Sequence, residues 1–272
     1  MNKQVSILGL GWLGIPLADA LLKENYKIKG STTSDQKLVD LVKEKYQAYK
    51  VILLENQIEG EVSECLKNSD ILVLNTPPGL RKNPSSNYVE KIKQLIPFIE
   101  ASTIKHVLFI GSTAVFKETE DFFVVKNNTL PNSTSNSGIQ LQEVEELLQK
   151  NKHFETTILR FAGLVDERRH PAKMMSKRSN IPNPNAPVNL IHREDCVGLI
   201  KAIISQNKWG EIYNAAYPMH PKKIEYYTKI CLLKKLPKPD FNINNPSLGK
   251  IIEGKDCSEE LNYEYCHSII ND

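Results

Sequence analysis

The residues best suited to chemistry stand near the start of the chain, where three glycines follow a short, mostly apolar run. Residues 5–8 read VSIL, and the next six, from Gly9 to Gly14, read GLGWLG. This pattern predicts a buried strand, a tight turn and an opening helix, the arrangement that cradles the diphosphate of a dinucleotide. Gly9 would turn the chain, Gly11 would let the backbone approach the phosphates, and Gly14 would let the helix pack on the strand. A tight turn that binds nothing is the alternative.

Trp12 and Leu13 complete this turn at the point where the predicted helix begins. The first N–H groups of a helix have no partner within it and carry a partial positive charge, so they attract an anion. Trp12 either covers the diphosphate or packs under the helix. We therefore predict a cofactor contact from both residues and from the three glycines.

The end of the second predicted strand bears on the choice between NAD and NADP. An Asp or Glu there usually binds the ribose hydroxyls of NAD and repels a 2′-phosphate. This chain has Ser31, Thr32 and Thr33 instead, with Thr32 near the expected acidic position. These residues leave room for a phosphate, and Lys37 could add positive charge. The sequence favours NADP(H), with NAD possible if Asp35 bends back to the ribose.

A third candidate segment ends the fourth predicted strand and reads Asn75, Thr76, Pro77 and Pro78. In open α/β sheets, ligands bind beyond the carboxyl ends of the strands. The prolines would fix a rigid turn beside the nicotinamide-side ribose, or they simply terminate the strand. We place these four residues among the predicted cofactor contacts.

Apolar runs alternate with amphipathic stretches through the first 160 residues, a rhythm that predicts repeated strand–helix–strand units and a Rossmann-type doubly wound parallel sheet. The predicted strands are 4–8, 26–30, 48–54, 71–75, 106–110, 156–161 and 212–215. The predicted helices are 13–23, 36–45, 61–67, 88–101, 138–151, 195–205 and 223–233. Residues 117–137 and 168–188, rich in Asn, Ser or Pro, are predicted to be irregular.

Composition excludes several classes of protein. The 272 residues suffice for one large α/β domain or for one domain with a small appendage. The formal net charge is +3, with both signs interspersed, so nothing favours nucleic acid. No apolar run approaches the roughly 20 residues that span a bilayer. We expect neither a nucleic-acid partner nor a membrane.

Cysteine and histidine usage points to a cytoplasmic protein without a metal site. The five cysteines are scattered with no C-x-x-C pair, which favours reduced thiols. The six histidines include no pair at helical metal-ligand spacing. Residues 5–8 are too short for the apolar core of a signal peptide.

Several later motifs follow the glycine turn in a fixed order. Residues 106–116 read HVLFIGSTAVF, residues 159–165 LRFAGLV, residues 189–195 NLIHRED, residues 210–215 GEIYNA, residues 249–252 GKII and residues 261–265 LNYEY. Together they resemble the extended short-chain dehydrogenases/reductases, in particular the NAD-dependent epimerase/dehydratase family. The glycine turn is also similar to that of β-hydroxyacid dehydrogenases. The Pro-rich, strand-like C-terminal third argues against the long all-helical domain of those proteins.

The resemblance to the epimerase/dehydratase family implies a seven-stranded Rossmann domain with a small C-terminal substrate-covering domain. Residues 1–165, with 189–218 returning to them, would form the first, and 166–188 with 219–272 the second. The implied substrate is a small polar molecule, such as a sugar or nucleotide-sugar. Many relatives pair through two long helices, so the resemblance is compatible with a homodimer.

The catalytic residues of that family are only partly present. Family members use a Tyr and a Lys four residues apart on one helix, with a Ser or Thr ending the fifth strand. Ser112 falls on the Ser/Thr position, but Ser137 stands where the Tyr belongs and Leu141 where the Lys belongs. No tyrosine occurs between Tyr88 and Tyr213. The chain is either an enzyme with another acid or base, drawn from residues 117–137 or from the substrate, or a non-catalytic NADP(H)-binding sensor or regulator.

Four further side chains have both a chemical and a structural interpretation. Arg169 could pair with a phosphate or carboxylate of a substrate, or be a solvated charge. His192 precedes a helix and is expected to tether it, and Asp195 is expected to be a helix N-terminal carboxylate. Glu145 and the other carboxylates of the helix 138–151 are expected to form a solvated face.

Overall fold

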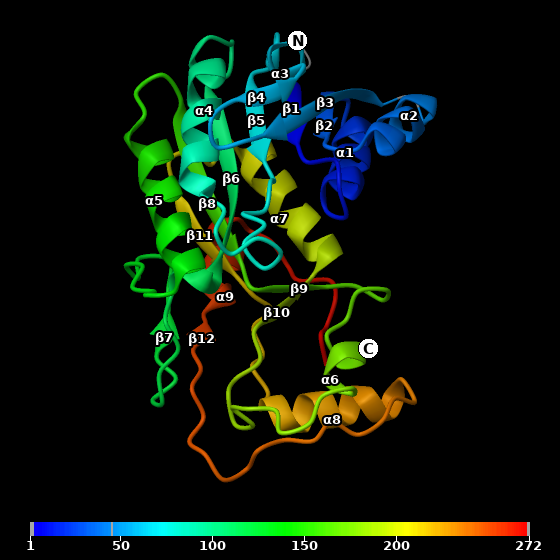
Figure 1. Ribbon diagram of the computed structural model, residues 1–272, viewed down its shortest axis with the longest axis vertical. Helices are drawn as coiled ribbons and strands as arrows, with labels where there is room; N and C mark the ends of the chain where they lie inside the picture. The colour runs from blue at the N-terminus through cyan, green and yellow to red at the C-terminus, as the bar shows by residue number, and fades with distance from the viewer. Residues whose placement is uncertain (1–2, 45, 271–272) are drawn as a thin grey trace.

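An eight-stranded sheet forms the centre of the computed structural model, which describes residues 3–44 and 46–270 (Figure 1). Every neighbouring pair of strands is parallel except the last, which is antiparallel. In spatial order the strands are β11 (Ile212–Ala215), β8 (Glu155–Phe161), β6 (His106–Ser112), β5 (Ile71–Leu74), β1 (Gln4–Leu8), β2 (Lys27–Thr32), β3 (Gln47–Leu53) and β4 (Ile58–Gly60).

The strand order reverses direction at β1. From β1 the chain moves outward through β2 and β3, and it then returns to β5 on the other side of β1 and moves outward again through β6, β8 and β11. Val5 faces Ile28 on one side and Ile71 on the other. In doubly wound sheets, such a switch point opens a crevice beyond the carboxyl ends of the two central strands. The glycine turn follows β1 at this place.

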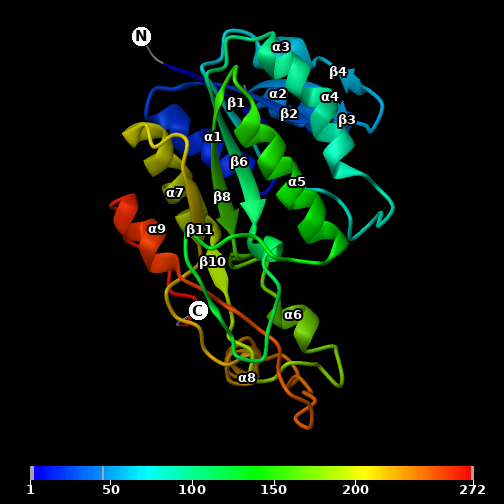
Figure 2. The same cartoon turned by 90° about the vertical axis from the view of Figure 1, so that its left-hand side faces the viewer.

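Helices cover both faces of the sheet, each above its own apolar cluster (Figure 2). One face carries α1 (Gly14–Lys23), α2 (Asp35–Lys43) and α7 (Arg193–Gln206), and the other carries α3 (Val62–Leu66), α4 (Tyr88–Glu100) and α5 (Asn136–Lys150). Ser34, Asn87 and Ser135 each cap a helix by accepting a backbone N–H three residues on. The buried strands therefore show continuous apolar runs rather than an alternation.

The remaining elements gather beyond the carboxyl ends of the strands (Figures 1 and 2). They are the 3₁₀ turn η1 (Thr113–Val115), β7 (Val124–Val125), β9 (Gly163–Val165), α6 (Ala172–Met175), β10 (Leu190–His192), α8 (Lys223–Leu233), β12 (Ile251–Ile252) and α9 (Gly254–Glu260). β9 pairs with β10, and β7 pairs with β12. A third apolar cluster joins α6 to α8. We refer to α6, α8 and this cluster as the C-terminal subdomain.

His192 and Asp195 both act at the start of α7. His192 Nδ1 accepts the Glu194 N–H at 3.3 Å and caps the helix, as expected. Asp195 is fully buried and accepts hydrogen bonds from the Tyr263 hydroxyl and from the N–H groups of Cys266 and His267. Its carboxylate therefore ties residues 263–267 to α7, in addition to lying in the first turn of that helix.

The fold class predicted from the sequence is confirmed, and most elements match within two residues. The expectation of seven strands is wrong, because the short antiparallel strand β4 pairs with β3 as an eighth. Strand β2 continues beyond the predicted residue 30 to Thr32. The helix predicted over 36–45 spans Asp35–Lys43, and Lys45 lies outside the described residues. Among the described residues, no helix is long and apolar enough to cross a membrane.

The expectation that Glu145 faces solvent is also wrong. Glu145 and Arg160 are each 2% exposed and form two hydrogen bonds of 2.9 and 2.7 Å between α5 and β8. Burial raises the pKa of the Glu145 carboxyl, and the hydrogen bonds and charge of Arg160 oppose that rise. The Arg160 guanidinium lies 5.2 Å from the centre of the Phe116 ring. A charge this deep is tolerated only because its partner is present.

We expect Glu145→Ala to lower the free energy of unfolding by about 3–5 kcal/mol, because the Arg160 guanidinium would remain buried without a counter-charge. Urea denaturation at neutral pH measures this loss. The control is Glu146→Ala on the same helix, which removes an exposed ion pair with Lys150 and should cost about 0–1 kcal/mol. Equal losses in the two variants would contradict the structural role of the buried pair.

Candidate functional site

The turn after β1 is built so tightly that a side chain on two of its glycines would clash with the backbone. Gly9 has a φ of +111°, and a Cβ on it would lie 2.6 Å from the carbonyl oxygen of Asn75. A Cβ on Gly14 would lie 2.1 Å from the carbonyl oxygen of Gly9. Real side chains do not tolerate such distances to backbone atoms. Gly9 therefore lets β1 and β5 lie close together, and Gly14 lets α1 pack against the end of β1.

Gly11, the middle glycine, differs from these two. A Cβ there would meet no atom nearer than the Gly9 carbonyl oxygen at 4.0 Å, so it would point into open space. Packing within the protein does not require glycine at this position. The space in front of Gly11 is where the sequence predicts a diphosphate.

Leu13 forms the start of α1 without a side-chain cap. Among the described residues, no backbone acceptor is recorded for the N–H of Trp12 or of Leu13. An uncapped helix N-terminus keeps its partial positive charge and its free donors. This end of α1 therefore offers unpaired N–H donors beside Gly11.

The three hydroxyl residues at the end of β2 do not all face outward. The Ser31 hydroxyl accepts the Gly9 N–H at 3.1 Å, and the Ser31 carbonyl accepts the Leu10 N–H at 2.7 Å. Ser31 and Thr32 are buried, whereas Thr33 is exposed. The hydroxyl of Ser31 therefore supports the glycine turn directly, and Thr33 is the most accessible of the three.

The predicted cofactor residues after β5 meet the same turn. The side-chain amide of Asn75 donates to the Gly9 carbonyl at 3.1 Å, and the Thr76 carbonyl accepts the Tyr88 hydroxyl at 2.7 Å. Pro77 is exposed, and Pro78 is half-buried. Burial raises the pKa of the Tyr88 phenol, so this tyrosine stays protonated. The structure thus brings the ends of β1, β2 and β5 to one place.

The candidate catalytic residues Ser112 and Ser137 lie on two elements that touch. Ser112 ends β6, and its hydroxyl accepts the Ala114 N–H at 3.2 Å. Ser137 lies in the first turn of α5 and is half-buried. A Cβ on the next residue, Gly138, would come 2.7 Å from the Ala114 carbonyl, so α5 begins directly against η1. Leu141, one turn further, is buried in the core.

A cluster that the sequence did not predict lies beside the glycine turn. The indole N–H of Trp12 donates to an Asp166 carboxylate oxygen at 2.7 Å, and Arg193 pairs with that same oxygen at 2.9 Å. The guanidinium groups of Arg169 and Arg193 lie 4.9 and 5.3 Å from the centre of the Trp12 ring. Arg169 is therefore placed at the glycine turn. Local sequence patterns could not reveal the roles of Asp166 and Arg193, because 154 residues separate Asp166 from Trp12.

The Asp166 carboxylate is stabilised in its charged form. Burial alone would raise its pKa, but the N–H of Arg169, the Trp12 indole, the charge of Arg193 and the N–H of Arg168 together lower it. Three donors and a cation on one buried carboxylate hold it rigidly. Trp12 is thereby fixed in one orientation next to Gly11.

Among the described residues, no group of three or more His, Cys, Asp or Glu side chains could hold a metal ion. Two cavities of about 390 and 310 Å³ are lined by residues around Phe154 and around Phe98. Their lining residues include none of the predicted site residues, so these two cavities do not mark the candidate site.

Three comparisons place the chain among known proteins. Residues 9–206 match a family model described as NAD(P)H-binding. Protein YeeZ of Escherichia coli strain K12 is 33% identical over 267 residues, which cover 97% of this chain and 96% of the relative.

Solved structures agree on the fold. A UDP-glucuronic acid 4-epimerase from Bacillus cereus, in complex with NAD, is 17% identical with a TM-score of 0.77, and the match covers 99% of this chain and 93% of that chain. A short-chain dehydrogenase/reductase superfamily protein from Agrobacterium tumefaciens with bound NAD is 15% identical with a TM-score of 0.76, covering 98% and 94%. The chain therefore belongs to the NAD(P)H-binding family, and its fold is the one that the short-chain dehydrogenases/reductases and NAD-dependent epimerases share.

Proposed function

We propose that this chain binds a nicotinamide dinucleotide with its diphosphate against the turn between β1 and α1. Gly11 carries the proposal, since it lies in a turn whose other two glycines are required by packing, yet open space lies in front of it. A glycine without a packing reason is expected where an outside group must approach the backbone. The uncapped start of α1 supplies donors at the same place.

We propose NADP(H) as the preferred form. No acidic side chain ends β2, where Thr32 and the exposed Thr33 stand. Asp35, the nearest carboxylate along the chain, pairs with Lys50 at 2.7 Å. That ion pair offsets the charge that would repel a 2′-phosphate. Lys37 lies in the first turns of α2 and adds positive charge.

We propose an oxidoreductase or epimerase-like reaction on a small polar substrate, such as a sugar or nucleotide-sugar. The similar fold of a UDP-glucuronic acid 4-epimerase supports this class. Bound nicotinamide supplies hydride transfer. The Ser112 hydroxyl accepts a backbone N–H and keeps its own proton for a substrate oxygen. Ser112 would thus orient the reacting oxygen at the end of β6.

A non-catalytic NADP(H)-binding sensor or regulator is the second candidate, and two side chains of α5 favour it. Ser137 occupies the position of the family tyrosine, and a serine hydroxyl is a far weaker acid than a phenol with a pKa near 10. Leu141 is buried in the apolar core and brings no positive charge to this site. The two candidate functions share one cofactor site and differ in turnover alone.

The resemblance implies a homodimer that pairs through two long helices, and we propose α4 and α5 for this role. The outer surfaces of these helices carry the exposed ion pairs Glu90–Lys93 and Glu146–Lys150. Such a surface would give a polar interface.

The glycine turn gives the sharpest test of cofactor binding. We expect Gly11→Val to abolish detectable binding of NADPH and NADH in calorimetry, because its side chain would occupy the open space, while thermal stability changes little. Gly14→Ala is the matched variant, and we expect it to lower the free energy of unfolding by several kcal/mol because of its backbone clash. Wild-type affinity in a folded Gly11→Val variant would contradict the proposed cofactor position.

The form of the cofactor can be tested on α2. We expect the wild type to be stabilised more by NADPH than by NADH in thermal shift assays at equal concentrations. Lys37→Ala should weaken NADPH binding about five-fold, a loss of about 1 kcal/mol, and leave NADH unchanged. Lys43→Ala, at the far end of the same helix, is the control. Equal or greater stabilisation by NADH would remove the NADP preference.

A measurement of catalytic turnover distinguishes the two candidate functions, an enzyme and a non-catalytic sensor. With NADP⁺ or NAD⁺ present, we expect the wild type to convert UDP-glucuronic acid or UDP-glucose, followed by nicotinamide absorbance and by product chromatography. Ser112→Ala should lower the rate by about 100-fold without weakening cofactor binding. Ser205→Ala, on α7, should leave both unchanged. A wild type that binds cofactor tightly but converts no sugar nucleotide of a broad panel would favour the sensor.

A further inference from the structure

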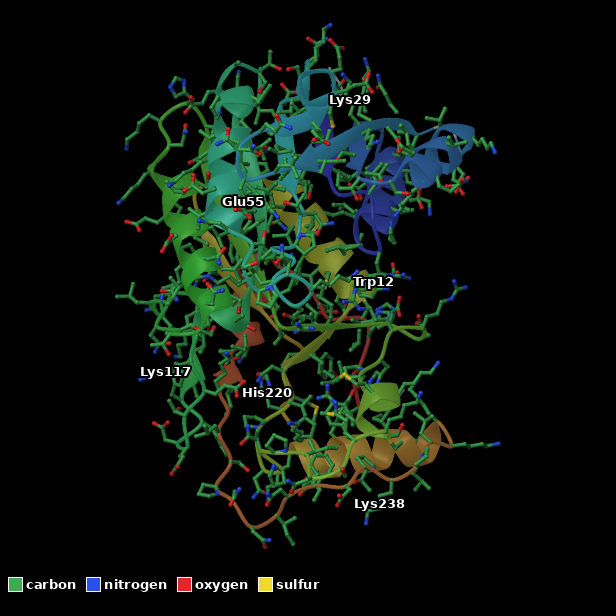
Figure 3. The ribbon with its side chains drawn as sticks, in the orientation of Figure 1. Trp12, Lys29, Glu55, Lys117, His220 and Lys238 are labelled. Atoms are coloured by element: carbon green, nitrogen blue, oxygen red, sulfur yellow. The ribbon has the colours of Figure 1, made fainter. Side chains whose placement is uncertain are left out.

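Trp12 joins two parts of the chain that are far apart in sequence. It lies between Gly11 and the uncapped start of α1, and its indole is held by Asp166, the residue directly after β9. Figure 3 shows Trp12 at the junction between the layered sheet and the C-terminal subdomain. Anything bound against Gly11 therefore lies next to the Trp12 ring and to the groups stacked on it.

Two arginines lie over this ring, and their charges are not equivalent. Arg193 is neutralised by Asp166 at 2.9 Å and by Glu194 at 3.2 Å. Arg169 is exposed, and among the described residues no carboxylate pairs with it. Its recorded side-chain contact is the Trp12 ring at 4.9 Å. Arg169 thus brings an uncompensated positive charge to the glycine turn.

The backbone that carries Arg169 is fixed in place. Asp166 accepts the N–H groups of Arg168 and Arg169 at 3.0 and 2.5 Å, and the Asp166 N–H donates to the Arg169 carbonyl at 3.1 Å. A guanidinium already held against an aromatic ring loses little further freedom when it binds an anion. Its planar fork matches two phosphate oxygens.

We infer that Arg169 is a second contact for the cofactor diphosphate, opposite the N–H groups at the start of α1. This inference rests on the proposed cofactor site. It assigns Arg169 to the diphosphate that NAD and NADP share, rather than to the 2′-phosphate or to a substrate. Since Arg169 leads from β9 into α6 of the C-terminal subdomain, a bound cofactor would join that subdomain to the Rossmann sheet.

Calorimetric titration of the wild type and of Arg169→Ala tests the inference, with NADPH, NADH, ADP-ribose and UDP-glucose as probes. We expect Arg169→Ala to weaken NADPH, NADH and ADP-ribose alike by about ten-fold, and UDP-glucose not at all. Arg168→Ala is the matched control, since Arg168 is exposed and lies beside Arg169 without a recorded contact to the Trp12 ring. Its affinities should stay within two-fold of the wild type.

A conservative variant and the fluorescence of Trp12 distinguish a loss of contact from a loss of folding. Arg169→Lys keeps the charge but loses the planar fork, so its affinities should fall between those of the wild type and Arg169→Ala. In a Trp209→Phe background Trp12 is the sole tryptophan, since the chain contains two. Its fluorescence should change when ADP-ribose binds.

Other results of these titrations would contradict the role of Arg169 or assign it to another group. Unchanged binding in Arg169→Ala, while Gly11→Val fails to bind, would overturn the role of Arg169 and leave the proposed cofactor site intact. A loss confined to NADPH would assign Arg169 to the 2′-phosphate, and a loss confined to UDP-glucose would assign it to the substrate. A wild type that binds none of the dinucleotides would overturn the proposed function itself.

Discussion

The carbonyl oxygen of Gly9 is the point on which the candidate site depends. It accepts the Gly11 N–H at 2.8 Å and the Asn75 side-chain amide at 3.1 Å, and it lies so close to Gly14 that no side chain fits there. The N–H of the same residue donates to Ser31. The backbone groups of this one residue therefore connect β1, β2, β5 and α1. Because backbone groups in this turn bond to one another and to side chains from neighbouring strands, the space before Gly11 is left open rather than filled.

The switch in strand order explains why the surroundings of this turn come from distant parts of the chain. The loops after β1 and β5 leave the sheet on opposite faces, so the space between them must be enclosed by later segments. Two buried carboxylates secure those segments. Asp166 joins the end of β9 to Trp12, and Asp195 joins Tyr263 and Cys266 to α7. The fold thereby connects its C-terminal segments to the first strand–helix unit without a covalent link.

Local sequence patterns predicted what depends on neighbours along the chain and missed what depends on distant partners. The strand Ile212–Ala215 and the helix Lys223–Leu233 were predicted to the residue, and the glycine spacing predicted the geometry at Gly9 and Gly14. Glu145 was predicted to face solvent, because a carboxylate on a helix is buried only when a partner such as Arg160 lies across from it. The short strands β4, β7 and β12 were not predicted, because two or three residues are too few to show a strand's alternation of apolar and polar side chains.

The glycine turn and the start of α5 depend on different contacts in this fold. The contacts that shape the glycine turn come from β1, β2, β5 and α1, and none of them involves α5. Gly138 brings the start of α5, which carries Ser137 and Leu141, against η1. The geometry of the glycine turn is therefore independent of the side chains that α5 carries beside η1.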